Sequence, residues 1–507
     1  MKRPRCWALF AACSLGWLIV SLLIAPSMSG IDVFYFRDAG WNLAATGHFE
    51  SAALAHSHDL VPRLYSYYTP MMPLLFAGYA SVFPRNAYAG TVFNLLLGLL
   101  AAAVALFWVL RQPSGKLRNS AAVAIAILPV VFITYDRPEA LGLVLACLTI
   151  AVGTRPGPRP WIAGLLAALT FLDHPFSAVI AAGWVSALFL SHHWSHPGRW
   201  PLTLRQIAVM GGMTVAGIAP VALLFYVLDP TSLTRFATNA FVVNSELGVS
   251  LDSNPWDSFV HKHLHLNTSP LQSGIYALSL GSLLLLAAWC WRRRRDLRAE
   301  EWFPLAACFL CPLCALLLFP GHPHYVKFLA FLIPIGLLIA NPPDGRLNVP
   351  GLGLLLFAMA INLPNQAIGL LQRIEELPSY RAAQGQPAAL LAQMASPEDI
   401  VALEGESYDL FKAQFHHLIA LQYVKDEDRY ARVAAVANCY DAFHGPDYAV
   451  RPLPDKLNAA DFHMIQADPQ HMWVTIGRHR IMSAQWGYGC DLYVRNSAAA
   501  GEKARVP

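Results

Sequence analysis

Long apolar stretches recur through the first 370 residues, and they constrain the fold more than any other feature of the chain. A helix needs about 20 mostly apolar residues to cross the hydrocarbon core of a bilayer. Eleven candidate spans lie at 6–26, 87–110, 119–135, 138–153, 160–172, 175–191, 206–228, 271–291, 302–319, 323–341 and 349–371. Only 13% of the residues are charged, about half the share in soluble domains. The sequence therefore predicts an α-helical polytopic membrane protein.

Basic residues are distributed unevenly among the loops between these spans. With the N-terminus inside, the inner segments carry 16 Lys and Arg, whereas the longer outer loops carry 7. This asymmetry follows the positive-inside rule and supports eleven crossings. Counting 68–83 as a further span would invert much of the pattern, and the stretch contains Pro70 and Pro73. We interpret 68–83 as a re-entrant or interfacial helix.

The first span, 6–26, bears on how the N-terminus is processed. Its apolar run is longer than the core of a signal peptide, so we expect an uncleaved helix, although Ala25-Pro26-Ser27 leaves cleavage possible. The net charge of +4 is small and the basic residues lie in short loops, which argues against nucleic-acid binding. Most acidic residues of 1–372 fall in the outer loops, so we expect any chemistry to face outward, at the periplasmic side of the inner (plasma) membrane.

The chain changes character after Gln372, and residues 373–507 contain no long apolar run. Strand-like pieces at 400–405, 472–477 and 490–496 alternate with helix-like ones at 382–395 and 407–424. We predict a membrane domain at 1–372, with outer loops at 27–86 and 229–270, followed by a small extracytoplasmic α/β or α+β domain. The two cysteines of this domain, Cys439 and Cys490, can pair in an oxidising compartment.

The start of the outer loop 27–86 contains the candidate catalytic residues. Asp32 lies just beyond the first span, followed by Tyr35, Arg37 and Asp38, and Tyr68 begins the proline-rich stretch. A carboxylate at the membrane boundary can deprotonate an acceptor beside a lipid-borne donor. The alternative for Asp32 and Asp38 is a helix cap and a local ion pair.

Two tight outward turns place further polar residues next to hydrocarbon. In the turn 135–139, Asp136, Arg137 and Glu139 are either functional, or an ion pair followed by a favourable helix start. Asp173 and His174 form the second turn, where capping of the next helix is favoured over proton relay.

A third outward corner contains His322, His324, Tyr325 and Lys327. An ammonium one turn inside an apolar helix needs an anionic partner, either a lipid phosphate or a nearby acid. The run His261, His263, His265 is a weak metal signal, and Cys308, Cys311 and Cys314 have the spacing of packing residues. We assign no metal ligands, although a divalent metal remains possible.

This layout resembles the GT-C superfamily of integral-membrane glycosyltransferases, which includes protein O-mannosyltransferases and bacterial aminoarabinose transferases. The resemblance rests on the early Asp32 and the context from Asp38-Ala39 to Gly47, on the YYTPMMP entry at 67–73, and on the turn 136–139. It extends over most of 1–370 and the outer C-terminal domain. Val33 stands where the family commonly has a glutamate.

The resemblance implies sugar transfer from a polyprenyl-phosphate carrier to a glycan, lipid or protein acceptor, with inversion at the anomeric carbon. Asp32 would be the general base, and Arg137, His324 and Lys327 would stabilise the departing phosphate. One alternative is a transporter or flippase of a lipid-linked or anionic substrate, in which charges would lie near the bilayer midplane. Another is a structural or sensory subunit whose outer domain binds a partner.

Overall fold

A computed structural model describes the greater part of the chain. The described residues are 3–26, 33, 36–51, 64–65, 68–83, 86, 88–134, 137–154, 159–194, 200–237, 270–293, 299–318, 324–341, 345–375, 377, 386–403, 408–412, 414–420, 432–438, 453, 457–466, 473–476, 479–482 and 491–496. In several helices and strands, including 324–327 and 473–476, only the backbone is described.

Each of the eleven apolar runs contains a helix. These helices are α1 (Arg3–Leu23), α5 (Tyr88–Arg111), α6 (Lys116–Ile127), α7 (Glu139–Gly153), α8 (Pro160–Asp173), α9 (Pro175–Trp194), α10 (Trp200–Leu228), α14 (Pro270–Arg292), α15 (Ala299–Leu318), α16 (His324–Ala340) and α17 (Asn348–Glu375). Among the described residues, α1, α5, α10 and α17 are long and apolar enough to cross a membrane. The protein is thus a helical multi-pass membrane protein, and the number of crossings stays a prediction.

The run 119–135 is not one continuous α-helix. Helix α6 ends at Ile127, and Pro129 begins the 3₁₀-helix η1 (Pro129–Phe132). Proline lacks the amide hydrogen that the helical ladder requires, and it disfavours the α conformation at the residue before it. Leu128 accordingly leaves the helical region, with φ −118° and ψ 48°.

The packing divides the chain into two compact units. The first comprises 1–17, 95–134 and 138–366, and the second comprises 18–94, 135–137 and 367–507. The second unit therefore combines the loop 27–86 with the C-terminal domain, which the sequence does not indicate. The predicted boundary at residue 372 concerns membrane topology and stays a prediction.

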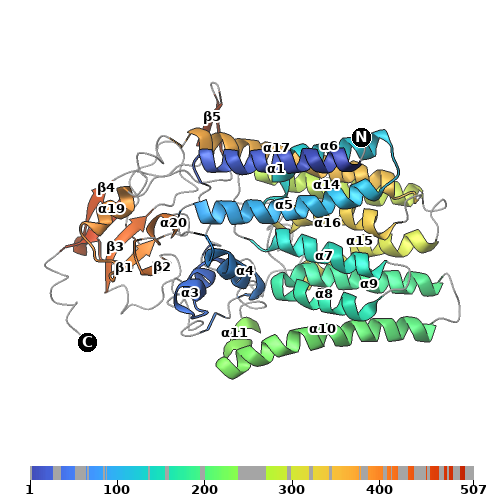
Figure 1. Ribbon diagram of the computed structural model, residues 1–507, viewed down its shortest axis with the longest axis horizontal. Helices are drawn as coiled ribbons and strands as arrows, with labels where there is room; N and C mark the ends of the chain where they lie inside the picture. Colours follow the sequence, from blue (N-terminus) through green and yellow to red (C-terminus); the bar gives the residue numbers. More distant parts are fainter. Residues whose placement is uncertain are drawn as a thin grey trace. The chain divides into compact units, whose positions relative to one another are not determined.

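The first unit is a bundle of helices with a continuous apolar core. Helix α8 packs against α10 and α7, and α9 packs against α15 and α7 (Figure 1). Trp184 is fully buried, and the ring lies so close to Gly336 that a side chain there would collide with it. Glycines allow neighbouring helices to approach closely, which drives association where lipid is the solvent. The short helix α11 (Ser232–Ala237) follows α10.

In the second unit, α3 (Asp38–Thr46) packs against α4 (Met71–Ala80). Helix α4 lies in the stretch predicted to be re-entrant or interfacial. Its 10 residues span about 15 Å, half of a hydrocarbon core, so α4 alone does not cross a bilayer. Near the end of α17, Arg373 donates hydrogen bonds to the backbone oxygens of Ala25 (2.6 Å) and Ser21 (3.0 Å), which stabilises the C-terminal end of α1.

The C-terminal domain contains a five-stranded mixed sheet in the order β2-β1-β3-β7-β4 (Figure 1). Strand β1 pairs in parallel with β2 and β3, whereas β7 pairs antiparallel with β3 and β4. The five strands are β1 (Ile400–Leu403), β2 (His417–Ala420), β3 (Val433–Asn438), β4 (Phe462–Gln466) and β7 (Asp491–Arg495). The other elements are the hairpin β5 (Trp473–Ile476) with β6 (His479–Met482), the helices α19 (Gln386–Ala392) and α20 (Tyr408–Phe411), and the 3₁₀-helix η4 (Ala459–Asp461). A small domain with a mixed sheet and short helices is therefore present.

The helix predicted over 407–424 is wrong. Among the described residues of this run, the helix is limited to α20, and 417–420 form strand β2, in which Leu418, Ile419 and Ala420 are buried. A short apolar run of this kind suits a buried strand as well as a helix, and pairing with the central strand β1 decides between them.

Cys439 and Cys490 lie outside the described residues. The residues next to them, Asn438 and Asp491, are Cα partners in the antiparallel pair of β3 and β7. The disulfide stays a prediction.

Candidate functional site

The structure describes the predicted site residues to different extents. Asp32, Tyr35 and His322 lie outside the described residues. His324, Tyr325 and Lys327 begin α16, where only the backbone is described. The second unit contains Arg37, Asp38, Tyr68 and Arg137, and the first unit contains Glu139 and His174. Arg137 is half-buried.

Asp38 is the first residue of α3, and its side chain is fully buried. The Ser51 hydroxyl donates to Asp38 Oδ2 at 2.8 Å, and the Tyr408 hydroxyl donates to Oδ1. Lys412 Nζ lies 3.4 Å from the same Oδ1. A buried carboxylate is tolerable when donors and an opposite charge compensate for its lost hydration, and this one has both.

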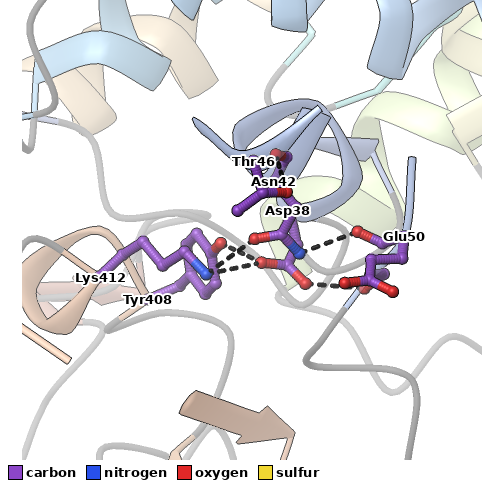
Figure 2. Close-up of polar contacts among 7 residues, drawn as sticks. Asp38, Asn42, Thr46, Glu50, Tyr408 and Lys412 are labelled. Atoms are coloured by element: carbon purple, nitrogen blue, oxygen red, sulfur yellow. Dashed lines mark hydrogen bonds and ion pairs between the residues drawn. The ribbon is translucent and has the colours of Figure 1, made fainter. Parts of the chain in front are cut away.

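One helical turn later, Asn42 extends this polar cluster. Its side-chain oxygen accepts from Lys412 Nζ at 3.2 Å, and its side-chain nitrogen donates to the backbone oxygen of Glu50 at 2.8 Å. Tyr408 and Lys412 approach α3 from one side, and Glu50 lies on the other (Figure 2). We call Asp38, Asn42, Ser51, Tyr408 and Lys412 the Asp38 cluster. It connects the segment 27–86 to the C-terminal domain.

Arg37 is also buried, with 1% of its surface exposed. Its guanidinium lies 5.8 Å from the centre of the Phe76 ring on α4, a cation–π contact. It also lies against Gly90 of α5, where any side chain would overlap with the guanidinium. Nearby, Tyr68 packs edge-to-face on Phe36 with ring centres 5.2 Å apart. Arg37 thus anchors the start of α3 to α4 and α5, and the adjacent Asp38 anchors it to the C-terminal domain.

We expect Gly90→Ala to destabilise the protein by about 1–3 kcal/mol, the usual cost of overpacking. The added methyl group occupies the position of the Arg37 guanidinium, and a buried cation has no inexpensive alternative place. The control is Gly78→Ala in α4, because no atom lies within 4 Å of a Cβ there. Denaturant unfolding in detergent measures the difference. Equal stabilities for the two variants would contradict the assigned packing of Arg37.

The first unit contains a second group of polar residues at the ends of helices. Glu139 begins α7, Asp173 ends α8 and His174 follows it, and all three are at most 2% exposed. His174 Nδ1 lies 2.5 Å from the Ser177 hydroxyl, and its ring packs edge-to-face on Phe328 at 5.5 Å. The structure thus brings the predicted residues Glu139 and His174 into one corner of the bundle.

A small cavity of about 20 Å³ adjoins this corner, with room for one water molecule. Its lining residues are Val131, Phe132, Thr134, Glu139, Ala140, Leu143, Phe328 and Phe331. Phe328 directly follows Lys327 in α16, so the backbone that begins α16 leads to this cavity.

Among the described residues, no group of three His, Cys, Asp or Glu could hold a metal ion. In the C-terminal domain, Glu398 has His416 Nδ1 at 2.8 Å and His417 Nε2 at 3.3 Å. Chiefly the hydrogen bond from His416 lowers the pKa of the Glu398 carboxyl. This group is well exposed, and we interpret it as a surface hydrogen-bonded cluster.

Tyr408, Lys412, Asn42 and Ser51 were not anticipated as partners of Asp38. Tyr408 and Lys412 lie four residues apart, the spacing of one helix face, which was the available signal. Since they lie 370 residues or more from Asp38, only the fold brings them together.

No protein-family model and no curated protein matches the chain. Among solved structures, the chain is similar to the crystal structure of ArnT from Cupriavidus metallidurans in the apo state. The two are 12% identical, with 86% of this chain and 94% of that chain covered and a TM-score of 0.45.

Proposed function

We propose that this protein is an integral-membrane glycosyltransferase. It moves a sugar from a polyprenyl-phosphate carrier to a glycan, lipid or protein acceptor on the outer face of the membrane. The supporting observation is that two buried acids of the helical bundle lie at helix ends. Glu139 is the first residue of α7 and Asp173 the last of α8, and the remainder of each helix contains no charged residue. This distribution suits chemistry at the membrane boundary.

In the proposed mechanism, Asp32 removes the proton from the acceptor nucleophile as it attacks the anomeric carbon. The bond to the carrier phosphate breaks with inversion, and Arg137, His324 and Lys327 stabilise the negative charge that develops on the phosphate. The other proposed substrate-binding residues are Tyr35, Arg37, Tyr68, Glu139, His174, His322 and Tyr325. Asp38, the second predicted catalytic acid, is reconsidered below because of its contacts.

The second candidate is a transporter of a lipid-linked or anionic substrate. The burial of Glu139, Asp173 and His174 in one corner favours it, since buried acids and histidines serve as proton relays in transporters. A transporter would need these groups to meet water on alternate sides, whereas a transferase needs them only at one boundary.

The deciding experiment is sugar transfer by the purified protein in detergent from a panel of radiolabelled polyprenyl-phosphate sugars. We expect transfer by the wild type and a loss of about 10²- to 10⁴-fold in Asp32→Asn, because the general base is removed. Asp59→Asn, an identical change in the same loop, is the control and retains activity. Transfer that survives in Asp32→Asn would reject the assigned base. Absence of transfer with every donor, together with substrate uptake in proteoliposomes, would favour the transporter.

A further inference from the structure

The Asp38 cluster has a feature that a simple docking contact does not require. A fully buried carboxylate takes part, and its donors come from two segments far apart in the chain: Ser51 from the first outer loop, and Tyr408 and Lys412 from the C-terminal domain. Charged hydrogen bonds are short and directional, so they fix a geometry more narrowly than apolar packing does. The side chain of Lys412 is 10% exposed, so water screens this ion pair only weakly.

The restraint on α3 extends toward the N-terminus along the backbone. The amide of Arg37 donates to the backbone oxygen of Val33 at 2.9 Å, which ties Val33 to the residue that precedes α3. Val33 is fully buried, and Asp32 is bonded to it directly. The position of the backbone at Val33 is therefore set by a helix that is anchored at Arg37 and Asp38.

We propose that the C-terminal domain holds α3, and with it the chain that leads to Asp32, in position through the Asp38 cluster. Tyr408 and Lys412 are then positioning residues for the transfer reaction, and Asp38 is their anchor and not a second base. The inference rests on the proposed function, because it assigns Asp32 the chemistry. It gives the C-terminal domain a part in the active site that does not require the domain to bind substrate.

The test combines hydrogen–deuterium exchange with kinetics on the full-length protein in detergent. The variants are Tyr408→Phe and Lys412→Met, which keep most of the side-chain volume. We expect the amides of 38–46 to exchange on the order of tenfold faster, because a hydrogen bond to a buried charge is lost. We expect kcat to fall about 10- to 100-fold with little change in KM, because the base is displaced while substrate binding is retained.

The matched control is Thr46→Val, which removes a hydroxyl from the exposed end of the same helix (Figure 2). It leaves both readouts as in the wild type. Unchanged exchange of 38–46 in the cluster variants would overturn the proposal, as would faster exchange with an unchanged kcat. If the wild type transfers no sugar, the proposed function fails and the catalytic part of this inference with it. The exchange measurement still decides whether the cluster holds α3.

Discussion

Asp38→Ala will lower the free energy of unfolding by about 3–5 kcal/mol, the cost of removing one partner from a buried ion pair. The substitution leaves the ammonium of Lys412 and the hydroxyls of Tyr408 and Ser51 without the carboxylate that they contact. Pulse proteolysis over a denaturant series in detergent, with detection of a C-terminal tag, measures the change.

A double substitution separates the ion pair from general damage to the core. In Asp38→Ala/Lys412→Met no charge remains buried at this position, so we expect the double variant to regain part of the stability. Additive losses would show that the two side chains do not interact, and a loss below 1 kcal/mol for Asp38→Ala would contradict the described contacts.

Gly164→Val will push α8 away from α10. We expect this to destabilise the bundle by about 1–3 kcal/mol. A Cβ at Gly164 would overlap with the backbone oxygen of Met210 and lie 2.7 Å from Met213 Cβ. Neither atom belongs to the flexible end of a side chain, so the helices themselves must move apart. In hydrocarbon, close packing of this kind is a main source of helix association.

The control for this packing is Gly212→Val in α10, where no atom lies within 4 Å of a Cβ. Thermal unfolding in detergent, followed by size-exclusion chromatography, should show a clear loss of stability for Gly164→Val and almost none for Gly212→Val. Similar losses in both variants would mean that valine disturbs α8 and α10 by itself, and that the assigned contact is wrong.

The helices of this protein could be predicted from its sequence because their signal is local. Each apolar run long enough to be counted contains a helix, and strands β1, β5 and β7 lie within the predicted strand-like pieces. Errors occurred where local signals are ambiguous: Pro129 ends α6 inside an apolar run, and the apolar run around Ile419 suits helix and strand equally. For β2, the paired strand β1 decided the outcome.

The sequence alone indicates a helical multi-pass membrane protein followed by a small α/β or α+β domain, because burial in lipid and strand alternation leave regular patterns along the chain. It also singled out Arg37, Asp38, Glu139 and His174, since polar residues beside hydrocarbon are costly unless they are paired or functional. Which of these groups meet depends on the folded structure. Asp38 contacts Tyr408 and Lys412 from the C-terminal domain. The sequence does not reveal these contacts, because a hydrogen bond depends on distance in space and leaves no periodic pattern along the chain.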